Sequence, residues 1–180
     1  DVCSSDLKSI KVMCRDIQMG TASAMLAVDD AGLDLDSLDH ERMGVEFGAN
    51  LMYSPPTQLN DPCWGCLDED RKFVLSKWAT EGLSRMEPLW LLKYLPNMPA
   101  CHIAIFVDAH GPSNSVTQNE ASGNLALGEA LGVIQRGAAD VMIAGATGAR
   151  LHQFKVIHAT LWKDLGYYPA DPSASCRPFD

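Results

Sequence analysis

The stretch from Gly111 to Gly145, GPSNSVTQNEASGNLALGEALGVIQRGAADVMIAG, has the pattern of a turn, a strand, a sharp elbow, a helix of small residues and a second strand. We expect strands over residues 115–118 and 141–144 and a helix from Glu120 to Arg136. The second strand is a short, uninterrupted apolar run, as in strands buried on both faces. Strand, helix and strand in this order form a βαβ unit, which predicts an α/β protein with a mostly parallel sheet.

The expected helix is apolar almost all round, because its leucines are interleaved with glycine and alanine and few charges intervene. This pattern predicts a helix that is buried or nearly so. Glycine costs about 1 kcal/mol in a helix interior. Gly128 and Gly132, four residues apart on one face, therefore predict another backbone element packed very close to them. The alternative is a poorly stabilised surface helix. Arg136 and Gly137 supply a cation and a stop at the C-terminal end.

The same stretch resembles the active-site segment of the β-ketoacyl synthases, the condensing enzymes of fatty acid and polyketide synthesis. In that family a GPN-type turn and a strand lead to a Thr-Ala-Cys-Ala type of elbow, a glycine-rich helix and a strand ending on Ala-Gly-Gly. Other stretches resemble the family in the same order: ASAMLAVDDAG at 22–32, ERMGVEFG at 41–48, LPNMPACHI at 95–103 and CRPFD at 176–180. The resemblance implies an α/β, thiolase-like layered αβαβα fold, present here as part of its N-terminal half.

Glu120 stands where the resemblance places the nucleophilic cysteine, counting from the Gly-Pro turn. A thiolate accepts an acyl group because it is nucleophilic near neutral pH and its product is again a thioester. A carboxylate would give a mixed anhydride, which lies uphill from a thioester. We therefore expect that Glu120 is not acylated. Cys101 lies in the segment before the expected strand and is expected to be an ordinary core cysteine.

Two roles remain open for Glu120. It is either a helix cap in a decayed site, or it has a non-acylating role like that of the glutamine which chain length factors and certain loading domains carry at this position. A helix N-terminus favours an ionised carboxylate by about 0.3 to 1 kcal/mol. Burial would act in the opposite direction and raise its pKa.

The resemblance also implies an acyl pocket and a dimer strand. The acyl pocket would include Leu95, Pro96 and Met98, although core packing explains these residues equally well. The dimer strand would pair with its copy across a two-fold axis, in a homodimer or in a heterodimer with an active ketosynthase. Its residues are Ser115, Val116, Thr117 and Gln118.

An acyl carrier protein is the other partner that the resemblance implies. Carrier proteins are acidic, so family members usually meet them with a basic patch. The candidate cations are equally typical of a solvated helix face; they are Arg71, Lys72, Lys77 and Arg85.

The function that follows is that of a β-ketoacyl synthase family protein of fatty acid or polyketide biosynthesis, non-condensing because of Glu120. The alternative is a non-catalytic partner subunit of the chain-length-factor type. A remote alternative is a dinucleotide-binding oxidoreductase, because GATG at 145–148 follows a strand and Asp164 lies downstream. That signal is weak, since a dinucleotide fold normally opens with this turn.

The composition of the chain indicates which classes of partner it is unsuited to bind. A net charge of −9 and a pI near 4.9 argue against nucleic acid and anionic membranes. No apolar run approaches the roughly 18 residues of a membrane helix, so we expect a cytoplasmic protein. No cofactor is implied. Cys63 and Cys66 have the CxxC spacing, but they follow a loop-rich stretch and lack a second ligand pair, so we expect a structural or incidental pair and no metal site.

The ends of the chain suggest a partial domain. Residues 1–7, DVCSSDL, resemble translated sequencing-adapter DNA and are expected to be a non-native leader. Residues 8–180 are then a partial N-terminal ketosynthase-like domain, with a variable surface insertion at about 52–85. The resemblance stops before the part of the family that carries the catalytic histidines, and none of the five histidines here lies in a matching motif.

Overall fold

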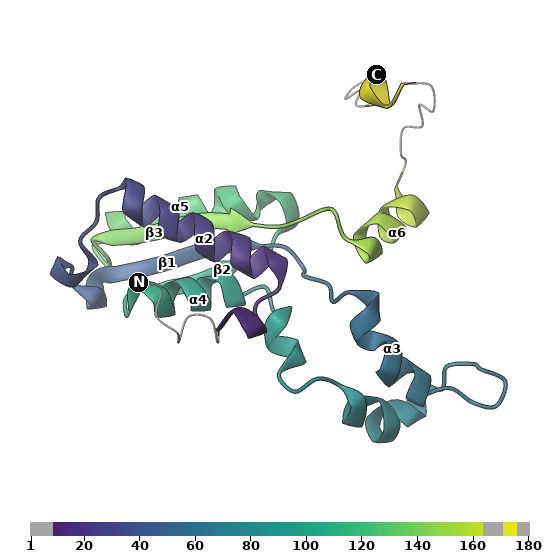
Figure 1. Cartoon of the computed structure of the whole chain (residues 1–180). Coiled ribbons are helices and arrows are strands. Elements are labelled where there is room, and N and C mark those ends of the chain that lie inside the picture. The colour runs from purple at the N-terminus through teal and green to yellow at the C-terminus, as the bar shows by residue number, and fades with distance from the viewer. Residues whose placement is uncertain (1–8, 164–170, 176–180) are drawn as a thin grey trace.

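The protein contains a three-stranded parallel sheet with helices packed against it (Figure 1). The computed structural model describes residues 9–163 and 171–175. The strands are β1 (Met43–Ala49), β2 (Ser113–Val116) and β3 (Val141–Thr147), in the order β2-β1-β3. β1 pairs in parallel with both neighbours, so that Phe47 is aligned with Ser115 on one side and with Gly145 on the other. The predicted α/β fold with a parallel sheet is confirmed.

Helices cover both faces of this sheet. α2 (Arg15–Asp30) and α4 (Met98–Val107) pack on one face, and α5 (Ser122–Gln135) packs on the other. The remaining helices are α3 (Pro56–Gly65) and α6 (Gln153–Trp162). Short turns of helix connect these elements: η1 (Ile10–Val12), η2 (Leu35–Ser37), η3 (His40–Arg42), η4 (Leu75–Lys77), η5 (Trp78–Gly82), η6 (Leu83–Arg85), η7 (Trp90–Lys93), η8 (Asn119–Ala121) and η9 (Pro172–Ser175).

The predicted βαβ unit is present as β2, α5 and β3, with shifted boundaries. β2 begins at Ser113 rather than Ser115, because the Gly111 N–H already donates to the Met43 carbonyl at 2.9 Å. Thr117 and Gln118, expected in the strand, lie after its end. β3 continues past the expected end to Thr147, where the chain still pairs with β1.

The prediction that α5 is buried on most sides is wrong for the described residues. Small residues, among them Gly123, Ala126 and Ala130, face the sheet, whereas the leucines, Gly128 and Gly132 point the other way. A methyl group on Gly128 would meet nothing within 4 Å, and one on Gly132 would meet only the Arg136 side chain. The buried residues are Ser122, Ala126, Ala130 and Val133, and the exposed apolar ones include Leu125, Leu127, Leu131 and Ile134.

The close backbone contact of α5 occurs instead at its first turn, against β1. A Cβ added to Gly48 would lie 2.7 Å from both the carbonyl carbon and oxygen of Ser122. Alanine side chains further along the helix allow this approach, because they hold the helix axis near the sheet. The closest backbone approach is therefore permitted by a glycine of the strand, and neither Gly128 nor Gly132 contributes to it.

The opposite face of the sheet carries the main hydrophobic core. Alternate residues of β1 point into it, as expected for a strand. They pack against one face of α2 and against α4, which explains why these helices form side by side. The core cluster consists of Ala24, Val28, Met43, Val45, Phe47, Ala100, Ile103, Val107 and Ile143.

Glu46 is an unexpected member of β1. It is only 2% exposed. Because side chains alternate along a strand, Glu46 points to the same face of the sheet as Gly44 and Gly48, which is the face covered by α5. Among the described residues none hydrogen-bonds its Oε1 atom. Burial raises the pKa of this carboxyl above its ordinary value of 4.5, Glu129 on α5 raises it further, and Arg136 opposes them.

Residues 52–85 form α3 and the turns η4 to η6, and in Figure 1 they project away from the sheet. Cys63 and Cys66 lie at the C-terminal end of α3 rather than before a helix, and both are free thiols. Two of the basic residues considered for a carrier-protein patch make contacts within this segment. Arg85 pairs with Asp61 at 3.4 Å, and Lys77 donates to the Leu67 carbonyl at 2.8 Å. That the segment is a variable insertion stays a prediction.

Several expectations cannot be followed into the structure. Residues 1–7, Asp164 and the CRPFD segment at 176–180 lie outside the described residues. Within the described part of the chain, no group of three or more potential metal ligands is found. A search of the same residues finds no helix with the length and hydropathy of a membrane span.

Two glycine substitutions test this packing. Gly48→Ala should lower the free energy of unfolding by about 1 to 3 kcal/mol, because the new methyl group overlaps the Ser122 backbone. Gly128→Ala should raise it by about 0.5 to 1 kcal/mol, because alanine favours helix and the added methyl group meets open space. Urea unfolding measures both variants. Equal effects of the two substitutions would contradict the packing described for α5.

Candidate functional site

The elbow between β2 and α5 is braced by Ser122. Asn119 has a φ of 50°, in the left-handed region that asparagine tolerates better than most residues. The Ser122 side chain is 3% exposed, and its hydroxyl donates to the Asn119 carbonyl at 2.8 Å. The same oxygen accepts from the Gln118 N–H at 2.8 Å. These two hydrogen bonds hold the turn η8, and with it Glu120, at the edge of the sheet.

Glu120 points outward from this turn and forms an ion pair with Arg150. The pKa of Glu120 lies below its ordinary value. The main cause is a hydrogen bond from its own backbone N–H, and the charge of Arg150 and, more weakly, that of Lys163 act in the same direction. The side chain is exposed, so burial does not reverse this direction. The carboxylate is therefore ionised near neutral pH. The N-cap of α5 is Ala121 and no side chain caps the helix, so the capping role left open for Glu120 finds no support.

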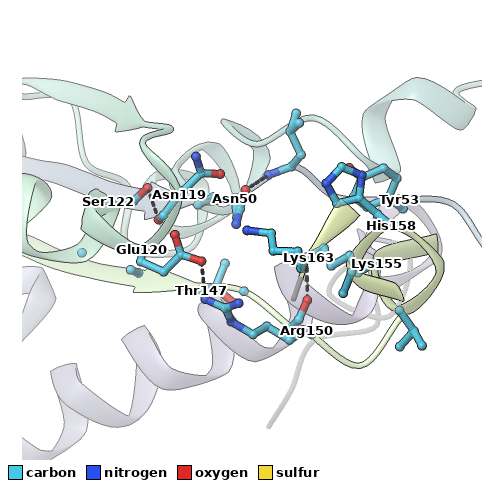
Figure 2. Close-up of a pocket in the computed structure, with 18 of the residues that line it drawn as sticks. Asn50, Tyr53, Asn119, Glu120, Ser122, Thr147, Arg150, Lys155, His158 and Lys163 are labelled. Atoms are coloured by element: carbon cyan, nitrogen blue, oxygen red, sulfur yellow. Dashed lines mark hydrogen bonds and ion pairs between the residues drawn. The ribbon is translucent and has the colours of Figure 1, made fainter. Parts of the chain in front are cut away.

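A cavity of about 820 Å³ lies in front of Glu120 (Figure 2). It is enclosed by the ends of β1 and β3, the elbow, the segment after β1 and α6. These are the carboxyl ends of parallel strands, the edge at which open α/β sheets commonly bind ligands. Polar side chains gather around the opening in Figure 2, namely Asn50, Tyr53, Asn119, Arg150, Lys155, His158 and Lys163.

Aromatic contacts hold α6 against the segment that follows β1. The Tyr53 ring lies 5.7 Å from the His152 ring and 6.4 Å from the Phe154 ring, measured between centroids. His152 is the N-cap of α6, and its Nδ1 atom accepts from the Phe154 N–H at 3.2 Å. Lys155 donates to the Ala149 carbonyl and lies 5.9 Å from the Tyr53 ring centre. This packing places the cationic side of α6 opposite Glu120.

Comparison with known proteins identifies the family of this chain. The model of the β-ketoacyl synthase N-terminal domain matches residues 27–180. The chain belongs to the β-ketoacyl synthase family. Nodulation protein E of Rhizobium leguminosarum bv. trifolii is 30% identical over 172 residues, which cover 96% of this chain and 38% of the relative. The 3-oxoacyl-(acyl-carrier-protein) synthase 2 of Staphylococcus aureus is 28% identical over 174 residues, covering 97% and 40%.

Solved structures show the same fold. A β-ketoacyl synthase from Burkholderia phymatum STM815 has a TM-score of 0.70 at 21% identity, over 95% of this chain and 38% of that one. A type II polyketide ketosynthase, solved in complex with its acyl carrier protein, has a TM-score of 0.69 at 18% identity, over 92% and 44%. The predicted fold, a partial N-terminal ketosynthase fold, is confirmed. The chain spans about two fifths of the length of the curated relatives cited above.

In this member of the β-ketoacyl synthase family the predicted acyl-pocket residues lie away from the cavity. Leu95, Pro96 and Met98 do not line it. The Pro96 carbonyl accepts from the Ser115 hydroxyl at 3.2 Å, and Met98 packs against a small core cluster beside α2. Their role beside an acyl chain stays a prediction. Cys101 lies on α4, across the sheet from α5, and its side chain is only half-buried.

The predicted dimer strand is an edge strand. β2 pairs with β1 along one edge, and no strand of the described residues pairs with its other edge. Ser115 and Val116 lie in β2, whereas Thr117 and Gln118 lead into the elbow. An unpaired edge is able to accept a further strand. Pairing with a second subunit stays a prediction.

The sequence reasoning did not identify the cations around Glu120. Lys155 and His158 are three residues apart and therefore lie on one side of a helix, a spacing that a search for helical periodicity would have found. Arg150 gives no such signal, because it follows the end of β3 in an irregular segment. The same segment argues against a dinucleotide turn, since β3 runs on to Thr147 and α6 begins only at Gln153.

The charge state of Glu120 is open to direct titration. Its carboxyl carbon resonance should shift with a midpoint below 4.5, and Arg150→Gln should move that midpoint upward without restoring the ordinary value, because the backbone N–H remains. Arg71→Gln, which removes an exposed arginine far along the chain from the cavity, should leave the midpoint unchanged.

The linked effect on stability has a defined sign. Because the pKa of Glu120 is lower in the folded state, its stabilising contribution is present above the unfolded value and is lost as the pH falls through the folded value. A midpoint at or above 4.5 in the unchanged protein would contradict the assigned ion pair.

Proposed function

We propose that this protein is a non-condensing member of the β-ketoacyl synthase family that acts in fatty acid or polyketide biosynthesis. The observation that carries the proposal is the environment of Glu120. A carboxylate stands at the elbow where we place the nucleophile of the family, and it is exposed, ionised and paired with Arg150. An elbow of this kind presents a side chain at the start of a helix, but this side chain has no means of carrying an acyl group as a thioester.

The ion pair further weakens Glu120 as a nucleophile. Arg150 stabilises the negative charge, so attack on a thioester would first break or strain this interaction. The product would be a mixed anhydride, less stable than the thioester from which it came. Both effects act in the same direction. The protein's contribution to biosynthesis is then binding or partnering, with the condensation carried out by another subunit.

Substitution at the elbow tests this assignment. Glu120→Cys places a thiol next to Arg150 and a backbone N–H, both of which lower a thiol's pKa, so that cysteine should become acylated. Treatment with a hexanoyl N-acetylcysteamine thioester, followed by peptide mass mapping, should find an acyl adduct at position 120 of the variant and none at Glu120 of the unchanged protein. The matched control is Glu129→Cys, which puts an exposed thiol on the same helix.

Glu129 is itself paired with Arg136, so both cysteines would lie beside an arginine. The expected difference in the rate of acylation is about tenfold, since only the cysteine at position 120 also lies beside a backbone N–H at the elbow. An acyl group found on Glu120 itself would overturn the proposal. Equal rates for the two cysteine variants would show that the elbow does not activate a thiol, and would remove the argument that it is a nucleophile position.

A partner-subunit role is the second candidate, and the edge strand β2 favours it. A chain in the ishigamide ketosynthase/chain length factor structure shares the fold, with a TM-score of 0.62 at 22% identity over 89% of this chain and 36% of that one. The open edge of β2 would pair with another subunit, in a homodimer or in a heterodimer with an active ketosynthase. We also propose an acyl carrier protein as partner and the cytoplasm as location, by analogy with the family.

A lysine in the predicted dimer strand should weaken such assembly. Thr117→Lys adds a charge to an exposed position next to β2, a device that blocks strand pairing at sheet edges. Sedimentation of the protein, alone and mixed with a ketosynthase encoded by a neighbouring gene, should show a dimer that this variant weakens by about tenfold or more in Kd. Thr57→Lys, at an exposed position of α3, should not change assembly. Equal dimerisation of both variants would argue against β2 as the interface.

A further inference from the structure

The cavity beside Glu120 is basic, although the chain as a whole is acidic. The protein has a net charge of −9, yet three cations and one carboxylate line this cavity. Arg150 comes from the segment after β3, Lys155 from α6, and Lys163 from just beyond α6. Counting only the lysines, the arginine and the glutamate, two positive charges remain in excess. Such a local reversal of charge raises the local concentration of anions.

The cations converge on one side of the cavity opening. In Figure 2 the Lys163 side chain reaches toward Glu120 and Asn50, and Arg150 approaches Glu120 from the other side of the carboxylate. The influence of Lys163 on the pKa of Glu120 agrees with this proximity. Lys155 is already held by the Ala149 carbonyl and the Tyr53 ring, so that little side-chain freedom is lost when it meets a ligand.

Glu120 occupies the position that an external anion would take. The side chains of Arg150 and Glu120 are 79% and 67% exposed, so their ion pair is accessible to solvent and open to exchange. A guanidinium group presents a planar fork of donors that binds either a carboxylate or a phosphate. An incoming anion would therefore find Arg150 preoriented, but engaged by an internal competitor.

We propose that this cavity binds a small ligand with a compact, doubly negative group, which displaces Glu120 from Arg150 and is held by Arg150, Lys155 and Lys163. The charge of such a group matches the excess of two positive charges. A dicarboxylate and a phosphate share this chemistry. The proposal rests on the proposed function, because it requires Glu120 to remain unmodified and free to move.

Apolar residues such as Leu51 and Val156 also line the cavity, but the groups at its opening favour a compact anion over an aliphatic chain at that point. Amide and charged groups surround the opening, including Asn50 and Asn119. An apolar chain placed here would remove these groups from water without replacing their hydrogen bonds, which is unfavourable. A compact anion instead receives donors from several directions.

Calorimetric titration at constant ionic strength tests the proposal. Succinate and inorganic phosphate are the two probes, and octanoate, with one charge and an apolar chain, is the comparison. At least one of the two dianions should bind saturably and more tightly than octanoate, and the one that does so identifies the source of the anion. Glu120→Gln removes the competitor at constant size and should tighten binding roughly three- to tenfold, whereas Arg150→Gln should weaken it by about tenfold.

The matched control is Glu129→Gln, which removes an exposed charge from the same α5 helix outside the cavity and should leave the affinity unchanged. Circular dichroism verifies that each variant is folded. Absence of saturable binding by both dianions, tighter binding of octanoate, or an unchanged affinity in Arg150→Gln would each overturn the inference. The proposed function fails separately, through an acyl adduct on Glu120, which none of these titrations detects.

Discussion

The pairing of β1 on both edges and its coverage on both faces is the constraint from which the rest of the structure follows. All seven of its residues are buried. One face must fit the apolar side chains of α2 and α4, and the other must admit the backbone of α5 at Gly48. Because α5 is held this closely at its first turn, the elbow before it has little freedom. The position of Glu120 is thus set by contacts between β1 and α5 and not by Glu120 itself.

The shape of the elbow does not depend on the side chain at position 120. Ser122 satisfies the backbone of the turn with its own hydroxyl, so the side chain at position 120 is not needed for the turn to form. A cysteine, a glutamine or a glutamate is therefore compatible with one geometry. The proposed replacement of the family's nucleophile by Glu120 would therefore leave the fold of the elbow unchanged. The cations that line the cavity with Glu120 come from α6 and its flanks, outside the elbow.

The sequence predicted those features that depend on neighbouring residues. The βαβ unit, the parallel sheet and the elbow follow from local periodicity and from the motif around Glu120. It failed where distant segments decide the outcome: the glycines of α5 suggested a close contact, but Gly48 of β1 provides it. The cavity was missed for the same reason. Arg150 is distant from Glu120 in the sequence, and the two side chains meet only because Arg150 follows the end of β3. The predicted acyl-pocket residues and the pairing of β2 concern surfaces that a second subunit or a ligand would define.

Folding shifts the pKa values of Glu46 and Glu120 in opposite directions, upward for Glu46 and downward for Glu120. Its pKa is higher in the folded state, so folding takes up protons above pH 4.5, and stability falls as the pH rises from 4.5 through the folded value. For Glu120, stability falls as the pH drops below 4.5. Between them, a carboxyl on the central strand and a carboxyl at the elbow favour a stability maximum near the ordinary pKa of glutamate. Mild acidity therefore neutralises the carboxyl that the central strand buries, while the carboxylate at the elbow keeps its charge.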